Sequence, residues 1–356
     1  MAAIPNEMRA LILKDYNVLE MGTLPVPRPG RGEVLCKIHA IAICGSDPGI
    51  IAGVNKGMWP PAFPFVLGHE WAGEIVEVGE NAGEFKVGDR VAGEAHNGCG
   101  VCNNCMIGRY NLCLNYGKPE TGHRHYGFNT MGANCEYNVY PIKCISKIPD
   151  SLSYEHATLV DTVGVALHAI ELIGITLAGT VAIFGGGPMG ISALQIVRSL
   201  GAATVIVVET GDRKEYAKKI GADYVVDFMK EDPVEAINKI TGGLGADEVL
   251  EASCADVAPY QCVQAVKKGG KVALIGFNYT KDLPFPVMGA MALKEVTLQG
   301  SRANPNVSKK VIAMLGKKMV DGDSLVTHVF PLEEYQKGLD TFVGKKDNCI
   351  KVVIKP

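Results

Sequence analysis

The chain has 356 residues, which is long enough for two domains that each bury a hydrophobic core. Hydrophobic residues make up 47% of the chain and charged residues 21%, the composition of an ordinary globular protein. The formal net charge is −3 and no block of Lys or Arg stands out, so we expect neither nucleic acid nor a membrane as a partner.

The opening residues, MAAIPNEMRALILKD, are charged and lack the continuous apolar run of a signal peptide. We find no run of 18 apolar residues and expect no segment that spans a bilayer. Eleven cysteines, several of them clustered, favour a reducing compartment in which metal binding is the main use of thiols. The expected location is the cytoplasm.

The chain changes character near its middle. Up to about residue 150, short β-type runs such as 33–41 and 72–79, bounded by Gly, Pro and Asp, predict a compact antiparallel or barrel-like domain. From about Thr180, strands alternate with helices, which is typical of βαβ units around a parallel sheet. The expected strands are 180–184, 204–208, 224–226, 247–250 and 271–276, and the expected helices are 188–200, 212–220 and 257–267.

The alternation ends near residue 297, and residues 349–355 form a strand that could return to the first domain. The fold class is therefore α/β, with a doubly wound parallel sheet over 157–296 inserted in a β-rich domain made of 1–156 and 297–356.

A dinucleotide-binding fingerprint, G-x-G-x-x-G, follows the strand at 180–184 and opens the next helix. Gly185 would make the tight turn, Gly187 would let the backbone approach a pyrophosphate, and Gly190 would allow close helix–strand packing. Pro188 suits the first helical turn, and the free amides of that helix would face the phosphates. The motif alone is weak, because Gly-rich turns occur in many α/β proteins.

Its context strengthens it, since Glu209 ends the second strand, 19 residues after Gly190. A carboxylate there accepts hydrogen bonds from the adenosine ribose and repels a 2′-phosphate, so NAD is favoured over NADP. Arg213 leaves NADP as the alternative. The candidate cofactor contacts are Gly185, Gly187, Pro188, Met189, Gly190, Glu209, Arg213, Ile275 and Phe277.

Two sets of residues have the chemistry of metal ligands. The lobe at about 95–115 carries the spacing C-x2-C-x2-C-x7-C, formed by Cys99, Cys102, Cys105 and Cys113. Four thiolates at this spacing can close a tetrahedron around a structural zinc, with an iron–sulfur cluster, reactive thiols or disulfides as the other interpretations.

The second set is dispersed and consists of Cys44, His69, Glu70 and Asp161. A Cys and a His with one carboxylate would leave an open fourth position, as a catalytic zinc requires.

Together these motifs resemble those of the zinc-containing medium-chain alcohol dehydrogenases over essentially the whole chain. The resemblance rests on Cys44-Gly-Ser-Asp47, Gly68-His-Glu70, the four-cysteine lobe and Gly185–Gly190 in that order. It implies a GroES-like catalytic domain and a Rossmann domain, with the active site in the cleft between them.

The resemblance also implies a catalytic zinc on Cys44, His69 and an acid, with Glu70 able to approach or exchange at the metal. Asp161 occupies the position where many members have Cys and polyol-type members have Glu, and we prefer it to Glu155. Ser46 is the candidate to pass the substrate proton outward, and Asp47 is expected to orient its neighbours. The family often has a His five residues after the catalytic Cys, but Gly49 stands there.

The expected function is zinc-dependent, NAD-linked oxidation of a secondary alcohol, such as a polyol or a cyclic or sugar alcohol, to a ketone. The expected cofactors are two zinc ions per chain and NAD, and the expected assembly is a homo-tetramer or homodimer. Oxidation of L-threonine is the alternative, which Gly93–Cys105 favours and Gly49 weakens. A zinc-free reductase or non-catalytic relative is a further one. His123 and His125 are interpreted as a solvated surface loop rather than an active-site mouth, and the scattered thiols are interpreted as core residues, namely Cys36, Cys135, Cys144, Cys254, Cys262 and Cys349.

Overall fold

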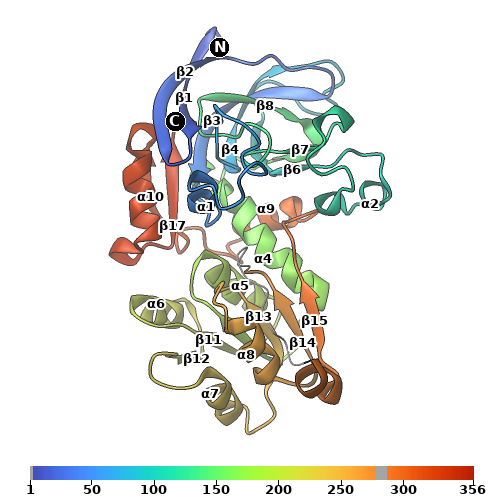
Figure 1. Cartoon of the computed structure of the whole chain (residues 1–356), viewed down its shortest axis with the longest axis vertical. Helices are drawn as coiled ribbons and strands as arrows, with labels where there is room; N and C mark the ends of the chain where they lie inside the picture. Colours follow the sequence, from blue (N-terminus) through green and yellow to red (C-terminus); the bar gives the residue numbers. More distant parts are fainter. Residues whose placement is uncertain (1–2, 277–286) are drawn as a thin grey trace. The chain divides into compact units, whose positions relative to one another are not determined.

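The computed structural model describes residues 3–276 and 287–356, so Phe277, a candidate cofactor contact, lies outside the described residues. The chain divides into two compact units. The first comprises Met1–Asp161, Pro305–Gly316 and Val326–Pro356, and the second comprises Thr162–Asn304 and Lys317–Leu325. Figure 1 shows the second unit as the sheet and helices labelled α5 to α8 and β11 to β15.

The first unit is built on a seven-stranded, mainly antiparallel sheet of order β16-β17-β3-β4-β5-β9, in which β8 also pairs with β3. Two two-stranded sheets, β1-β2 and β6-β7, complete it. Its strands are β1 (Glu7–Asp15), β2 (Val18–Pro25), β3 (Glu33–Ala42), β4 (Glu70–Val78), β5 (Arg90–Gly93), β6 (His96–Asn97), β7 (Arg124–His125), β8 (Tyr137–Pro141), β9 (Ile145–Lys147), β16 (Val326–Pro331) and β17 (Lys351–Lys355). Its helices are α1 (Asp47–Ile51), α2 (Asn103–Met106), α3 (Tyr154–Ala157), α9 (Ser308–Gly316) and α10 (Tyr335–Val343).

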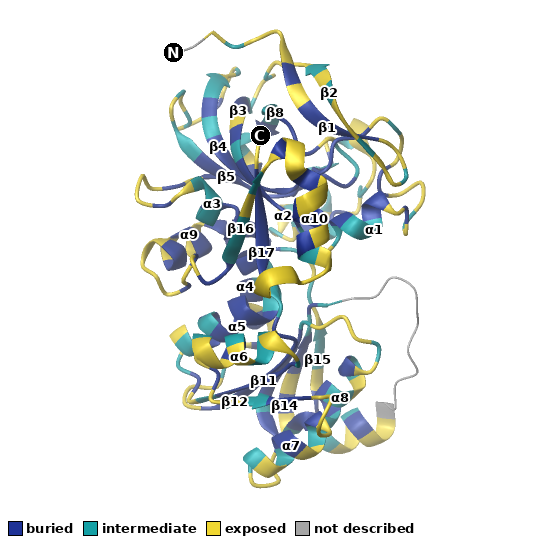
Figure 2. Ribbon diagram, turned by 90° about the vertical axis from the view of Figure 1, so that its left-hand side faces the viewer, coloured by how far each residue is buried: buried dark blue, intermediate teal, exposed yellow. Residues whose placement is uncertain are grey.

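The second unit is a six-stranded parallel sheet of order β12-β11-β10-β13-β14-β15. Helices α5 and α6 lie on one face of it and α7 and α8 on the other (Figure 2), and the central strands are almost completely buried. Its strands are β10 (Thr180–Phe184), β11 (Thr204–Val208), β12 (Tyr224–Val226), β13 (Ala246–Glu251), β14 (Val266–Leu274) and β15 (Thr297–Gly300). Its helices are α5 (Pro188–Ser199), α6 (Asp212–Ile220), α7 (Pro233–Ile240) and α8 (Ala258–Ala265).

The division along the chain differs from the boundaries expected at 156 and 296. Helix α4 (Leu159–Ile173) starts in the first unit and continues into the second, because a helix does not stop at a domain boundary unless a cap or breaker stops it. Strand β15 was expected in the β-rich domain, but it pairs in parallel with β14 from Thr297 to Gly300 and extends the second unit's sheet. The C-terminal strand β17 does return to the first unit, where it pairs with β3.

Among the described residues, one helical stretch, Tyr154–Ile173, is long and apolar enough to cross a membrane. Most of it is buried, with 72% of its 18-residue window inside the fold, and the core helix of a globular protein passes the same test.

Five of the six scattered cysteines are buried, as predicted, but Cys254 is exposed and is not a core thiol. It lies in the turn after β13 with a φ of 60°, in the left-handed region, and the turn keeps its side chain out of the core.

Candidate active site

The pairing of β17, β3 and β4 brings the dispersed motifs together. Ala42, at the end of β3, lies opposite Val353 on one side and Glu70 on the other. The backbone N–H of Ile43 then donates to the carbonyl of Val352 at 2.9 Å, so the loop that carries Cys44 continues alongside Lys351. The strand register therefore brings Cys44, Glu70 and Lys351 close together from distant parts of the chain.

Ligand atoms of Cys44, His69 and Glu70 all lie within 4.8 Å of one another. His69 is 3% exposed and Glu70 is fully buried. A thiolate sulfur, an imidazole nitrogen and a carboxylate oxygen are the donors that zinc accepts in proteins. These side chains therefore fit a zinc ion with a position left open.

The Asp47 carboxylate lies near the His69 ring without a hydrogen bond to it. The ring Nδ1 lies 3.8 Å from Asp47 Oδ1, while the other oxygen of Asp47 accepts the backbone N–H of Cys44 at 2.9 Å. A carboxylate behind a metal-binding histidine fixes the ring and leaves Nε2 for the metal. Burial opposes a charged imidazole, but the Cys44 thiolate and the nearby carboxylates raise the pKa of His69 to about 10, as expected of a ring surrounded by anions.

Lys351 is the functional candidate that the sequence interpretation missed. Its side chain is 2% exposed, and its Nζ lies 2.5 Å from Glu70 Oε2. Burial disfavours the ammonium, but the negative charges of Glu70 and Cys44 outweigh burial and raise the pKa of Lys351. The available signal was a Lys inside the apolar run 349–354, because lysine is almost never fully buried unless it is paired.

Asp161 does not belong to the compact group of three. It is buried in the first turn of α4. Burial and the negative charge of Glu70 raise the pKa of Asp161 to about 7, so its carboxyl lies near these residues, but it is not among the three whose ligand atoms converge. Glu155, the residue we set aside, instead pairs with Lys355 at 2.5 Å and is partly exposed.

Ser46 is the N-cap residue of α1, but its hydroxyl makes no cap hydrogen bond. The Oγ atom is buried and has no hydrogen-bond partner in the described part of the chain. A buried hydroxyl without a partner, two residues from Cys44, is available to a substrate hydroxyl.

The structure corrects the interpretation of His123 and His125 as a solvated loop, because they are 1% and 4% exposed. The rings of His125 and Phe128 stack at 3.9 Å, and Phe128 lies 4.6 Å from the ring of His69. Tyr116 Oη lies 2.6 Å from His125 Nδ1. The pairing of β7 with β6, in which His125 lies opposite His96, holds residues 123–125 against the fold. This polar segment is therefore buried by a strand that is distant in the sequence.

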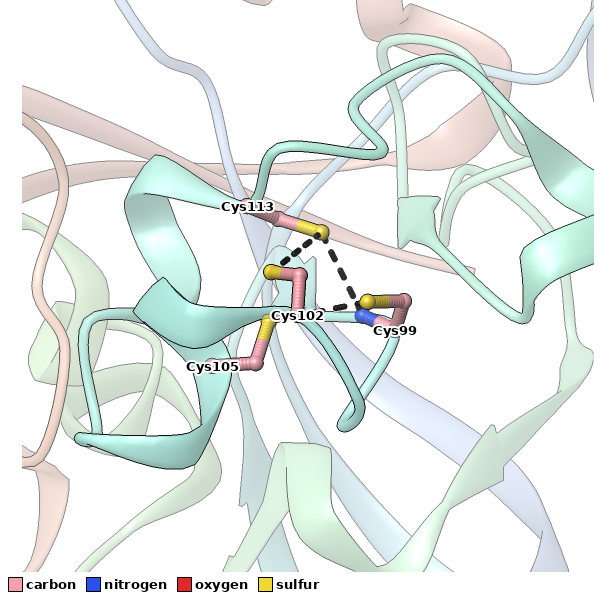
Figure 3. Close-up of side chains that lie close together, drawn as sticks. All are labelled: Cys99, Cys102, Cys105 and Cys113. Atoms are coloured by element: carbon pink, nitrogen blue, oxygen red, sulfur yellow. Dashed lines mark hydrogen bonds between the residues drawn. The ribbon is translucent and has the colours of Figure 1, made fainter.

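Figure 3 shows the four cysteines of the lobe pointing toward a common centre. Their sulfurs all lie within 4.8 Å of one another, and the pairs Cys99–Cys105 and Cys102–Cys113 are 4.0 Å apart. Zn–S bonds of ~2.3 Å give a tetrahedron with edges of about 3.8 Å. The four cysteines are free thiols and form no disulfides. An iron–sulfur cluster is disfavoured as well, because its cysteines bind separate iron atoms and do not converge on one ion.

The surroundings of the lobe shift the pKa values of its thiols in opposite directions. Backbone amides, first that of Val101, lower the pKa of the Cys99 thiol to about 6, whereas burial raises that of Cys105 to about 12. A bound cation ionises a coordinating thiol, so a cation is what brings all four to the thiolate form. The donor set fits a structural zinc.

The second unit carries the glycine turn at the end of β10. A Cβ on Gly190 would lie 1.8 Å from the carbonyl oxygen of Gly185, and Gly185 itself has a φ of 105°, so both positions require glycine. Helix α5 begins at Pro188 with Gly187 as its N-cap and without a side-chain cap, and Met189 follows in its first turn. Its first amides are therefore available to a pyrophosphate.

Glu209 follows β11 and is 8% exposed. Its carboxylate accepts the backbone N–H of Gly186 at 2.7 Å and of Thr210 at 2.9 Å, so it is fixed beside the glycine turn. A Cβ on Gly187 would lie 3.3 Å from Arg213 Nη1, which places that guanidinium beside the same turn. Ile275, buried, follows β14 at the same carboxyl edge of the sheet. The glycine turn, the first turn of α5 and the Glu209 carboxylate together fit a dinucleotide.

Two family models match the chain: the alcohol dehydrogenase GroES-like domain over residues 30–150 and the zinc-binding dehydrogenase domain over residues 188–317. The chain is 35% identical to a sorbitol dehydrogenase of Bacillus subtilis (strain 168), over 99% of this chain and 98% of the relative. It is 34% identical to an L-threonine 3-dehydrogenase of Pyrococcus horikoshii, over 94% of this chain and 95% of the relative.

Solved structures agree with these matches. An alcohol dehydrogenase from Escherichia coli CFT073, complexed with NADH, superposes with a TM-score of 0.89 at 28% identity, covering 99% of this chain and 100% of that one. A proposed zinc-binding dehydrogenase from Sinorhizobium meliloti 1021, bound to NADP, gives 0.90 at 28% identity with the same coverage.

The chain belongs to the zinc-dependent alcohol dehydrogenase family, whose named relatives are dehydrogenases. Within it, the chain is similar to sorbitol and L-threonine dehydrogenases. The predicted family and the fold class, a Rossmann-type sheet with a GroES-like domain, are confirmed.

Proposed function

We propose that the protein is a zinc-dependent, NAD-linked dehydrogenase that oxidises a secondary alcohol, a polyol or a cyclic or sugar alcohol, to a ketone. The observation that carries the proposal is the convergence of Cys44, His69 and Glu70 ligand atoms within 4.8 Å. In a site of this kind zinc supplies Lewis acidity toward the substrate hydroxyl, and NAD supplies the hydride acceptor.

The residues of the chain have distinct roles in this proposal. Cys44 and His69 would hold the metal, and the Asp47 carboxylate lies 3.8 Å from the His69 ring, where it would orient that ring. Lys351 pairs with Oε2 of Glu70 and so would fix this carboxylate, the third candidate ligand, beside Cys44 and His69. Ser46 Oγ, buried and without a hydrogen-bond partner among the described residues, accepts a hydrogen bond from the substrate hydroxyl and gives its own proton to water, so that it relays the proton and does not keep it.

Ser46 tests the proton step. Ser46→Ala is expected to lower kcat by about 10²-fold with little change in KM, because positioned proton transfer contributes about that much and more. Steady-state kinetics with saturating NAD measure both constants. An unchanged kcat would reject the relay, and Ser153→Ala, which removes the N-cap of α3, serves as the serine control.

Asp161 tests the acidic side of the centre. Asp161→Asn keeps the shape but removes the charge next to Glu70 and His69, so we expect zinc affinity or activity to fall by about 10–100-fold. Zinc competition with a chelator and turnover are measured on the same preparation. If zinc affinity and turnover both stayed at their wild-type values, Asp161 would have no role in the metal centre.

Glu209 tests the choice of NAD. Glu209→Ala removes the charge that disfavours a 2′-phosphate while Arg213 remains beside the turn, so the preference for NAD over NADP in kcat/KM is expected to fall at least about tenfold. Glu231→Ala, at an exposed position of the same unit, is the control. A preference that does not move would contradict the assignment of Glu209.

The substrate class is tested by an NAD-coupled screen of polyols, inositols, diols and aminoalcohols, including L-threonine, read as NADH absorbance. The proposal expects turnover of at least one polyol or cyclic alcohol above that of L-threonine. L-Threonine as the best substrate would replace the polyol proposal with the amino-alcohol one, which the similarity to L-threonine 3-dehydrogenases supports. We also propose a homo-tetramer or homodimer, which light scattering on the purified protein tests.

A further inference from the structure

The Glu251 carboxylate at the end of β13 has one satisfied oxygen and one unsatisfied oxygen. The side chain is 1% exposed. Its Oε1 accepts three hydrogen bonds from the following turn: Ser253 N at 2.8 Å, Ser253 Oγ at 2.7 Å and Cys254 N at 3.0 Å. Its Oε2 is buried and has no hydrogen-bond partner in the described structure. Leaving a buried carboxylate oxygen without a donor costs free energy, so this atom points to a missing donor.

The position of Glu251 in the sheet indicates which donor is missing. Strand β13 lies next to β10, and Glu251 is the Cα partner of Phe184, the residue just before the glycine turn. The order β12-β11-β10-β13-β14-β15 reverses between β10 and β13. A dinucleotide binds across this switch point, with one nucleotide over each half of the sheet. Glu209 follows β11, in the half of the sheet that would bind the adenosine. Glu251 ends β13, in the other half, which would bind the nicotinamide nucleoside.

The described neighbours of Glu251 leave space beside its Oε2 atom. A Cβ on Gly276, just beyond β14, would lie 2.7 Å from Glu251 Oε2, so only glycine leaves room beside that oxygen. Ser301 follows β15, and its backbone N–H donates to the carbonyl of Leu274 at 2.9 Å. The Oγ of Ser301 is also buried, and it has no hydrogen-bond partner in the part of the chain that the structure describes. Two unsatisfied polar atoms therefore occur at the carboxyl ends of β13 and β15.

We infer that Glu251 Oε2 accepts a hydrogen bond from the nicotinamide-side nucleoside of the bound dinucleotide. The donor is a ribose hydroxyl or the carboxamide N–H, both of which the oxygen can accept. Glu251 is thus a positioning residue for the reactive half of the cofactor, as Glu209 is for the adenosine half. The inference rests on the proposed function, because it needs the chain to bind a nicotinamide dinucleotide.

The discriminating variant is Glu251→Gln, because a glutamine keeps an acceptor for the turn at Oε1 while it replaces Oε2 with a donor. We expect the Kd for NAD, measured by calorimetry without substrate, to rise at least about tenfold, whereas the Kd for ADP stays within about twofold. ADP-ribose separates the two donors: it is weakened like NAD if the donor is the ribose hydroxyl and binds like ADP if the donor is the carboxamide.

Glu248→Gln is the matched control, since Glu248 is 3% exposed on the same strand and both its oxygens already accept hydrogen bonds from Thr176. Equal NAD binding by wild type and Glu251→Gln would overturn the inference, and so would an equal loss of NAD and ADP binding. A wild-type protein that binds neither NAD nor NADP would instead overturn the proposed function.

If Glu251→Gln does not fold, the wild-type protein still decides the question. A crystal structure with NAD is expected to show a nicotinamide-side donor about 2.7–3.2 Å from Glu251 Oε2. A water molecule as the partner of that oxygen would overturn the inference.

Discussion

Replacing Lys351 by Met is expected to destabilise the folded protein by about 3–5 kcal/mol, because the substitution leaves the Glu70 carboxylate buried without its counter-ion. Glu70 is fully buried and Lys351 is 2% exposed, so solvent cannot replace the lost ammonium. The same change removes the ammonium that fixes the Glu70 carboxylate, a candidate zinc ligand, and turnover is expected to fall by about 10–100-fold. Urea unfolding followed by circular dichroism and steady-state kinetics measure the two effects.

The strand that carries Lys351 also offers its own control. Lys355, on the same strand, pairs with Glu155 but is 52% exposed, and exposed ion pairs contribute about 0–1 kcal/mol. Lys355→Met is therefore expected to change neither stability nor turnover appreciably, and Lys351→Arg is expected to restore part of both. Wild-type stability and turnover in Lys351→Met would contradict the role given to the Glu70–Lys351 pair.

Replacing Cys105 by Ser is expected to remove one zinc ion per chain and to lower the melting temperature by at least about 10 °C. The reason is that the lobe has little core of its own. Helix α2 buries none of its residues, and Val101, Met106 and Ile107 are about 70% exposed, at 73%, 72% and 69%. On this account a bound zinc ion, rather than apolar packing, would hold the lobe together.

Differential scanning calorimetry and zinc analysis measure the effect, and hydrogen exchange is expected to rise over 99–115. Cys254→Ser is the control, because Cys254 is exposed and outside the lobe. If Cys105→Ser kept its full zinc content and melting temperature, the lobe would not be a structural zinc site.

Much of the parallel sheet could be predicted from the sequence, because alternating apolar strands and amphipathic helices are local signals. β10, β11, β12 and α6 have the predicted bounds. One error is instructive. The helix expected to reach residue 267 ends at Ala265, and the strand expected from 271 begins at Val266. Val266 pairs with Ala246 of β13, and this pairing overrides the polar, glycine-containing run that follows it.

The site was only partly predictable, because some of its residues lie in local sequence motifs and others are brought in only by the pairing of distant strands. Cys44, His69 and Glu70 lie in short motifs that can be recognised in one chain. Lys351 depends on the register between β17 and β3, two strands from opposite ends of the sequence, and no local pattern specifies that register. Glu251 was missed for a similar reason, since an acid at the end of a strand is unremarkable until its unsatisfied oxygen is seen.

The most direct test of the central claim is an anomalous difference map, recorded at the zinc absorption edge, from crystals of the wild-type protein. The account predicts two peaks per chain. One lies among the four sulfurs of the lobe, and the other lies within bonding distance of Cys44 Sγ and His69 with a carboxylate beside it. A zinc-replete protein with a single peak, at the lobe, would contradict a catalytic metal centre and leave only the nucleotide-binding unit with an assigned role.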